Sequence, residues 1–202
     1  MSRVKSKSWV PAEGIPDESN PGALLGLPKP VFGLRVILSV VSMIFFLLLI
    51  SYLSRMQIGD WHPLPEPPIL WVNTAILLLS SAALQWAKNA WSRAALGEVR
   101  KGLLAAGILT GLFLIGQLRA WFEIRDSGYL LEGNPATSFF YLITLIHGLH
   151  LLGGLVAWLR TYLRIIHGQS LLRIRMGIEL CTVYWHFMLA VWLIFYGLML
   201  ST

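Results

Sequence analysis

Residues 137–159 read TSFFYLITLIHGLHLLGGLVAWL, and this stretch decides the fold class of the chain. It contains no Asp, Glu, Lys or Arg, and a helix of about 20 apolar residues crosses the roughly 30 Å hydrocarbon layer of a membrane. The stretch nevertheless carries His147 and His150, one helical turn apart. Ionisable side chains are costly inside a membrane and usually face protein or a cavity. The two histidines therefore mark an interior packing or functional face.

Four further apolar runs of similar length accompany this stretch. Hydrophobic residues make up 56% of the 202 residues and charged residues only 13%, which is typical of a membrane protein. The connections between the runs are too short for an additional soluble domain. The sequence predicts an all-α membrane protein, a bundle of five transmembrane helices at about residues 34–54, 68–88, 102–122, 137–159 and 178–200.

The chain is expected to have two regions, a tail at residues 1–33 and the membrane bundle at residues 34–202. The tail is rich in proline and glycine, which favours an extended, irregular backbone. It is not expected to be a signal peptide, because no apolar segment precedes the first helix. A disordered cytoplasmic tail and a strap along a partner subunit both fit this composition.

The basic residues are distributed unevenly between the two expected sides of the membrane. All 16 Lys and Arg except Arg55, Arg119 and Arg125 lie in or next to the tail, between the second and third runs, or between the fourth and fifth. The positive-inside rule then predicts an N-in/C-out topology with five crossings. This topology accounts for the net charge of +6, so no nucleic-acid partner is expected.

Several polar residues are placed at matching depths in different helices. At 1.5 Å per residue, His150 and His186 lie at one level, and Asn73 and Gln117 lie at another. Matching depth is what hydrogen bonding between helices in lipid requires, although a lipid-headgroup, proton or ligand site also fits. The candidate structural or lipid-contact residues are Asn73, Gln117, His147, His150, Trp185 and His186.

The cysteine and histidine content limits the metal chemistry of the chain. Cys181 is the single cysteine, so no disulfide framework and no thiolate-bound iron–sulfur or dinuclear copper centre is expected. His147 and His150 share one helix face and cannot bind one haem iron from opposite sides, whereas His150 and His186 could do so geometrically. A zinc site lacks a carboxylate or cysteine to complete it. We expect no metal, no cofactor and no catalytic residue in this chain.

Four stretches resemble subunit III of the haem–copper respiratory oxidases. Residues 68–81, PILWVNTAILLLSS, are followed by Trp86-Ala87 and resemble the family's P-x-L-N-T-x-x-L-x-x-S-S…W-A helix. Residues 139–154, FFYLITLIHGLHLLGG, resemble its F-F-x-x-T-G-x-H-G-x-H helix. Residues 184–196, YWHFMLAVWLIFY, resemble its Y-W-H-F-x-D-x-V-W closing helix, and residues 111–117, GLFLIGQ, resemble the helix that carries its Gln. The five-helix length resembles bacterial members of the family.

The chain departs from the family pattern at its acidic positions. Arg93 stands where the family usually has an acid after the W-A motif, and Ala120 and Leu189 replace two further acids. Leu145 follows Thr144 in place of glycine. The chain therefore looks like a divergent branch, in which any contribution of these carboxylates to proton uptake is altered.

The resemblance implies a non-catalytic subunit III of a terminal oxidase that uses cytochrome c or quinol. Such a subunit stabilises the catalytic subunit, binds lipids and sustains proton uptake during oxygen reduction in aerobic respiration. It implies oxidase subunits I and II as partners, haems and copper in those subunits, bound phospholipid, and a multi-pass location in the bacterial cytoplasmic (inner) membrane. An accessory membrane subunit of a nitric oxide reductase system, and an unrelated five-helix transporter or cytochrome b, are the alternatives.

Overall fold

The computed structural model describes every residue except 1–27, 60, 63–66, 129–133 and 202. The described residues form five α-helices and no strand. All five are long and apolar enough to cross a membrane, so the predicted all-α membrane fold is confirmed. The helices are α1 (Lys29–Met56), α2 (Ile69–Ser92), α3 (Leu96–Asp126), α4 (Pro135–Ile166) and α5 (Leu171–Leu200).

The first helix begins earlier than expected. It starts at Lys29, so residues 29–33 are helical and not part of an extended tail. Pro30 is compatible with this start, because the first helical turn has no intrahelical acceptor for the N–H that proline lacks. The expectation for residues 1–27 lies outside the described residues.

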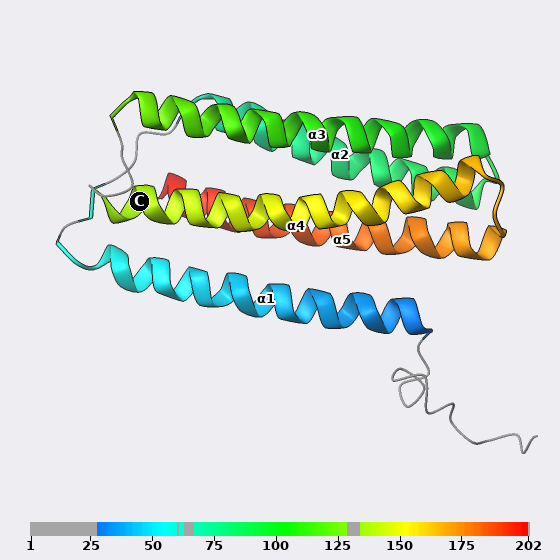
Figure 1. The fold of residues 1–202 in the computed structure, drawn as a ribbon, viewed down its shortest axis with the longest axis horizontal. Coiled ribbons are helices and arrows are strands. Elements are labelled where there is room, and N and C mark those ends of the chain that lie inside the picture. The colour runs from blue at the N-terminus through cyan, green and yellow to red at the C-terminus, as the bar shows by residue number, and fades with distance from the viewer. Residues whose placement is uncertain (1–27, 60, 63–66, 129–133, 202) are drawn as a thin grey trace, which may run out of the picture. The chain divides into compact units, whose positions relative to one another are not determined.

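The chain divides into two compact parts, Met1–Ile37 and Leu38–Thr202, and the division falls inside α1. The described residues of the first part belong mainly to the first turns of α1 and are exposed or half-buried. In the second part, α2 packs most extensively against α3, while α5 packs against α2 and α4, and α4 against α3. Figure 1 shows α2 with α3 and α4 with α5 as two neighbouring helix pairs.

Residues 38–56 of α1 lie farther from the other helices than those helices lie from one another. No Cα atom of these residues comes within 8 Å of a Cα atom in α2–α5. Large aromatic rings span this separation: the Phe45 and Phe195 ring centroids are 5.6 Å apart, and those of Tyr52 and Phe139 are 5.5 Å apart. This part of α1 is therefore held by side chains and not by close backbone packing.

Glycine permits the closest approaches between the packed helices. A Cβ atom at Gly107 on α3 would collide with the ring of Trp158 on α4. A Cβ atom at Gly154 on α4 would lie 2.7 Å from the Tyr184 ring on α5. On the α2–α3 pair, an added Cβ atom at Gly116 would collide with the Asn73 side chain, and one at Gly102 would lie 2.9 Å from the Ala87 Cβ atom, so these two glycines permit the close approach of α2 and α3.

Candidate functional site

A buried polar cluster joins α2, α3 and α5. The indole N–H of Trp185 donates to Thr110 Oγ1 at 3.0 Å and to Ser80 Oγ at 3.2 Å, and these two hydroxyl oxygens are 2.8 Å apart. Both hydroxyls also lie within hydrogen-bond distance of the Ala106 carbonyl oxygen, which accepts from them. All three side chains are buried. Sequence reasoning selected Trp185 but missed Ser80 and Thr110.

Two further links lie nearer the N-terminal end of α2 than this cluster. Asn73 on α2 donates through Nδ2 to Gln117 Oε1 on α3, at 3.5 Å. On the same helix, Thr74 Oγ1 accepts a 3.0 Å hydrogen bond from the Trp192 indole of α5. The structure thus brings together Asn73 and Gln117, which the sequence analysis placed at the same depth in the membrane. The Thr74–Trp192 bond was not expected.

His147 lies in an aromatic enclosure inside the bundle. Its side chain is 1% exposed, and its ring centroid lies 5.8 Å from that of Phe113 and 5.3 Å from that of Trp192. Phe45 of α1 approaches the same ring edge-on. Within the part of the chain that the structure describes, neither ring nitrogen has a hydrogen-bond partner. Packing, and not hydrogen bonding, therefore positions this imidazole.

His150 lies one turn further along α4 and is half-buried. Its Nδ1 is 2.7 Å from the Ile146 carbonyl oxygen of the preceding turn. Because a carbonyl oxygen only accepts, Nδ1 carries the proton and donates this bond. Phe45 also packs against this ring, with centroids 5.6 Å apart. His147 and His150 therefore share a face of α4, but only His147 is fully buried.

His186 lies on the exposed side of α5 and starts a polar chain along α2. Its Nδ1 contacts Ser81 Oγ, its Nε2 lies 3.1 Å from Gln85 Oε1, and Gln85 donates to Asn89 Oδ1 at 3.0 Å. We refer to Ser81, His186, Gln85 and Asn89 as the outer polar chain. Sequence reasoning found only His186, although Ser81, Gln85 and Asn89 recur every four residues on α2 at suitable depth.

His150 and His186 do not form a joint site. His150 packs toward α1, whereas His186 bonds to α2. Nδ1 of His150 and both ring nitrogens of His186 already make hydrogen bonds. A haem held between the two histidines would have to replace these bonds. Among the residues placed in the structure, no group of three or more His, Cys, Asp or Glu could hold a metal ion. Cys181 is a buried free thiol. Hydrogen bonds of the Trp185 cluster, the Asn73–Gln117 pair and the outer polar chain connect helices.

Residues 32–201 match the protein family described as cytochrome c oxidase subunit III. The chain belongs to the cytochrome c oxidase subunit III family. Cytochrome c oxidase subunit 3 of Anopheles quadrimaculatus is 34% identical over an alignment of 199 residues that covers 89% of this chain and 74% of that protein. The protein of the same name from Corynebacterium diphtheriae is 28% identical over an alignment of 193 residues that covers 90% of this chain and 94% of that protein. The one from Thermostichus vulcanus is 30% identical over 174 residues, 84% and 85% of the two chains.

Membership in the subunit III family makes the chain a multi-pass membrane protein and a subunit of an oxidase complex. The two bacterial relatives match over a larger share of their own length than the insect relative does. This difference agrees with the resemblance to the shorter bacterial form of subunit III.

The three positions at which the sequence departs from the expected acidic pattern have different environments in the structure. Arg93 is at the C-terminal end of α2, and its Nη2 atom lies 3.3 Å from Glu98 Oε2 in an exposed ion pair. Ala120 is fully buried on α3, and Leu189 is half-buried on α5. No carboxylate stands at these three positions, and two of them are in packed parts of the bundle.

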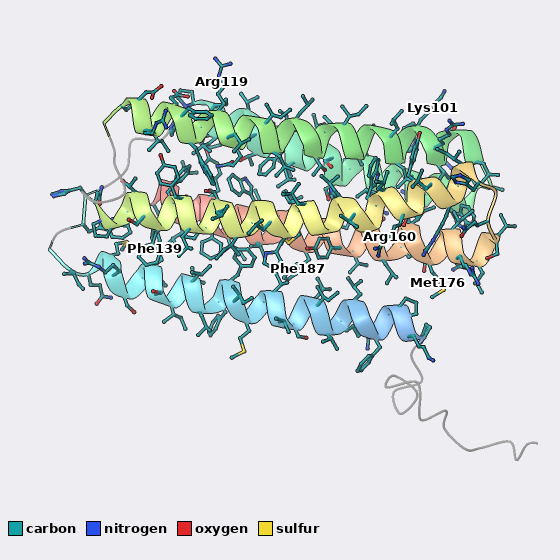
Figure 2. The ribbon with its side chains drawn as sticks, in the orientation of Figure 1. Lys101, Arg119, Phe139, Arg160, Met176 and Phe187 are labelled. Carbon is teal, nitrogen blue, oxygen red and sulfur yellow. The ribbon has the colours of Figure 1, made fainter. Side chains whose placement is uncertain are left out.

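The two ends of the α2–α5 bundle differ in the side chains that they carry. Figure 2 shows Arg119 and Phe139 toward one end, and Lys101, Arg160 and Met176 toward the other. The second end holds the α2–α3 and α4–α5 connections, where most of the basic residues outside the tail lie. Its ion pairs include a 2.8 Å contact between Arg175 and Glu179, one turn apart on α5.

Proposed function

We propose that the chain is the non-catalytic subunit III of a haem–copper terminal oxidase. It stabilises the catalytic subunit, binds lipids and sustains proton uptake while the complex reduces oxygen in aerobic respiration. One observation carries this proposal: polar residues from three of the motifs that resemble the family make hydrogen bonds between helices of this chain. Asn73 bonds to Gln117, and Trp185 bonds to Thr110.

The redox groups are proposed to reside in the partner subunits I and II. Within this chain the three membrane histidines are engaged by aromatic rings, a backbone carbonyl, or the outer polar chain. None of them is arranged with a second imidazole as a pair of axial ligands. Phospholipid is proposed to cover the exposed apolar side chains of α1, among which are Val40, Met43 and Leu47.

The chain is proposed to lie in the bacterial cytoplasmic membrane with N-in/C-out topology. The end of the bundle that carries the α2–α3 and α4–α5 connections is the basic one, and basic connections remain on the cytoplasmic side. Residues 1–33, including the turn of α1 that begins at Lys29, are proposed to precede the membrane bundle on that side.

The chain is proposed to support proton uptake by stabilising the oxidase complex. The family's acids are replaced by Arg93, Ala120 and Leu189, and Arg93 already pairs with Glu98. A chain without carboxylates at these positions cannot use them to collect protons. Its contribution is then to hold the catalytic subunit in a form that continues to take up protons.

The missing acids also favour one alternative, an accessory membrane subunit of a nitric oxide reductase system. Such a protein needs the helix-joining motifs but not the carboxylates of a proton-collecting surface. Ala120 and Leu189 are apolar and packed, so neither position preserves even a neutral polar substitute.

Co-purification from native membranes separates the two functions. A tagged copy of the chain is isolated in mild detergent, and the partners are identified by mass spectrometry. The proposal expects catalytic oxidase subunits, a haem spectrum from those subunits, and oxygen consumption by the complex. Recovery of a nitric oxide reductase with no oxygen consumption would establish the alternative, and recovery of no haem protein would refute both.

A further inference from the structure

One level inside the α2–α5 bundle brings together side chains from all four helices. Asn73 of α2 donates to Gln117 of α3. The Trp192 indole of α5 donates to Thr74 of α2, and its ring packs against the His147 ring of α4 with centroids 5.3 Å apart. All five side chains are more than nine-tenths buried. We refer to Asn73, Gln117 and His147 as the inner polar layer.

The hydrogen bond between Trp121 and Thr144 fixes the register of α3 against α4. The Trp121 indole donates to Thr144 Oγ1 at 2.9 Å. Gln117 lies four residues earlier on α3, and His147 lies three residues later on α4. Successive membrane-spanning helices run in opposite directions, so each step moves about one turn the same way along the bundle. Phe113, one turn from Gln117 on the same face of α3, packs against the His147 ring, so Gln117 and His147 lie at one level on facing sides of α3 and α4.

Gln117 and His147 carry buried polar atoms that no described group satisfies. Within the part of the chain that the structure places, Gln117 Nε2 and both ring nitrogens of His147 have no hydrogen-bond partner. The amide nitrogen is a donor, and a neutral imidazole has one N–H donor and one acceptor nitrogen. Buried polar groups in native proteins are nearly always bonded, because an unmet donor or acceptor is costly. The inner polar layer therefore requires a partner that can both accept and donate.

The burial of these atoms limits which partner can reach them. They have almost no accessible surface, so a lipid or a helix of another subunit cannot contact them from outside the bundle. A cation would face the Gln117 donor, and no described group of three or more His, Cys, Asp or Glu could hold a metal ion. An anion would be buried with no Lys or Arg in residues 137–159 of α4 to pair with it. A water molecule is uncharged, and it both accepts and donates.

The α3–α4 interface is less tightly filled at the level of His147 than farther along the two helices. A Cβ atom added at Gly148, next to His147, would meet only Leu114 outside its own helix, at 3.7 Å, which is ordinary van der Waals contact. At Gly107 of α3, an added Cβ atom would collide with Trp158 of α4. The helices are thus pressed together near Gly107 but not beside His147. An interface of this kind that is lined by unsatisfied polar atoms suits an internal water.

We infer that one internal water molecule joins Gln117 to His147 inside the bundle. The Gln117 amide donates to the water oxygen, and the water donates to the acceptor nitrogen of His147. Aromatic packing positions the His147 ring, and its remaining N–H is left to the surrounding ring faces, which are weak acceptors. Because Asn73 already donates to Gln117, the water completes a set of hydrogen bonds across α2, α3 and α4. This site is independent of which complex the chain joins.

Water-edited solid-state NMR of the full, isotope-labelled chain in lipid bilayers tests for this water. The Gln117 side-chain amide is expected to receive polarisation from water protons at short mixing times, although the residue is buried. The Trp185 indole N–H is the control, because it is also buried but donates to Thr110 and not to water; it is expected to receive none at those times. No transfer to Gln117, or equal transfer to Gln117 and Trp185, would overturn the inference and leave the proposed function intact.

A double-variant cycle tests whether Gln117 and His147 share the water. Gln117→Met removes the amide, and His147→Phe removes the ring nitrogens but keeps a ring. Their losses in melting temperature are expected to be non-additive, whereas Gln117→Met and the control His150→Phe, one turn further along α4, are expected to add.

The two experiments together leave no outcome open. Additive losses in both pairs would overturn the inference. Coupling between Gln117 and His147 without water transfer to Gln117 would indicate a direct bond and would also overturn it. The transfer measurement uses the unsubstituted chain, so it decides the case if a variant fails to fold.

Discussion

At the residue scale, several cross-helix hydrogen bonds involve side chains that sequence reasoning did not select. Thr110 and Thr182 are both buried, and both donate to the carbonyl one turn earlier on their own helix. Only Thr110 also accepts from another helix, through the Trp185 indole. The two residues are therefore a natural comparison of a hydroxyl that joins helices with one that does not.

We predict that Thr110→Val destabilises the chain and that Thr182→Val does not. The first substitution keeps the shape but removes the better acceptor of the Trp185 N–H, at a cost of about 1 kcal/mol. The second removes only a local bond to its own helix. Thermal unfolding in detergent measures both, and equal stability of the two variants would contradict the importance of the cluster.

His186 and His150 form a second matched pair. His186→Leu removes the acceptor of the Ser81 hydroxyl and the donor to Gln85 Oε1, and an unsatisfied buried polar group costs about 1–3 kcal/mol. The hydrogen bond that His150→Leu removes is one to its own helix, at the Ile146 carbonyl. We predict that His186→Leu lowers subunit retention after heating of the complex, with the oxygen rate per haem preserved, and that His150→Leu changes retention little. Normal retention with abolished oxygen consumption would contradict this assignment.

At the scale of helices, α1 is the element that depends most on single side chains. Phe45 contacts His147, His150 and Phe195, whereas the neighbouring Phe46 is 60% exposed. We predict that Phe45→Ala lowers stability by about 3–5 kcal/mol because it empties a packed site. The control Phe46→Ala is expected to be neutral. Hydrogen exchange along residues 38–56 provides the readout, and identical protection in both variants would show that α1 is held in another way.

The sequence predicted the helices better than their contacts. Apolar runs located all five helices because only a helix satisfies its own backbone in lipid, but the ends were missed because hydropathy marks only the hydrocarbon part. The expected depth of each residue in the membrane was enough to place Asn73 at the level of Gln117. Ser80 and Ser81 belong to a recognised motif, but neither their contacts nor those of Thr110 could be predicted, since small hydroxyl residues are common in membrane helices and their role depends on which face meets a neighbour. Helix rotation and crossing angle fix that face, and both depend on packing between helices, which includes the close approaches at Gly107 and Gly154.

At the scale of the whole molecule, the arrangement of basic residues gives a prediction of topology. A reporter fused after Gly168, in the α4–α5 connection, is expected to be cytoplasmic, and a reporter at the C-terminus is expected to be periplasmic. The reason is that all 16 Lys and Arg except Arg55, Arg119 and Arg125 lie on one expected side. A periplasmic signal after Gly168 would reverse the orientation of the bundle.

The central claim is that the chain sustains an oxidase without performing its chemistry. The most direct measurement is the time course of oxygen consumption by the purified oxidase, with the chain present, removed and added back. We predict an equal initial rate per haem in all three preparations, faster loss of activity during turnover when the chain is removed, and recovery of the slow decay when it is restored. An initial rate near zero without the chain, or identical decay with and without it, would contradict this account.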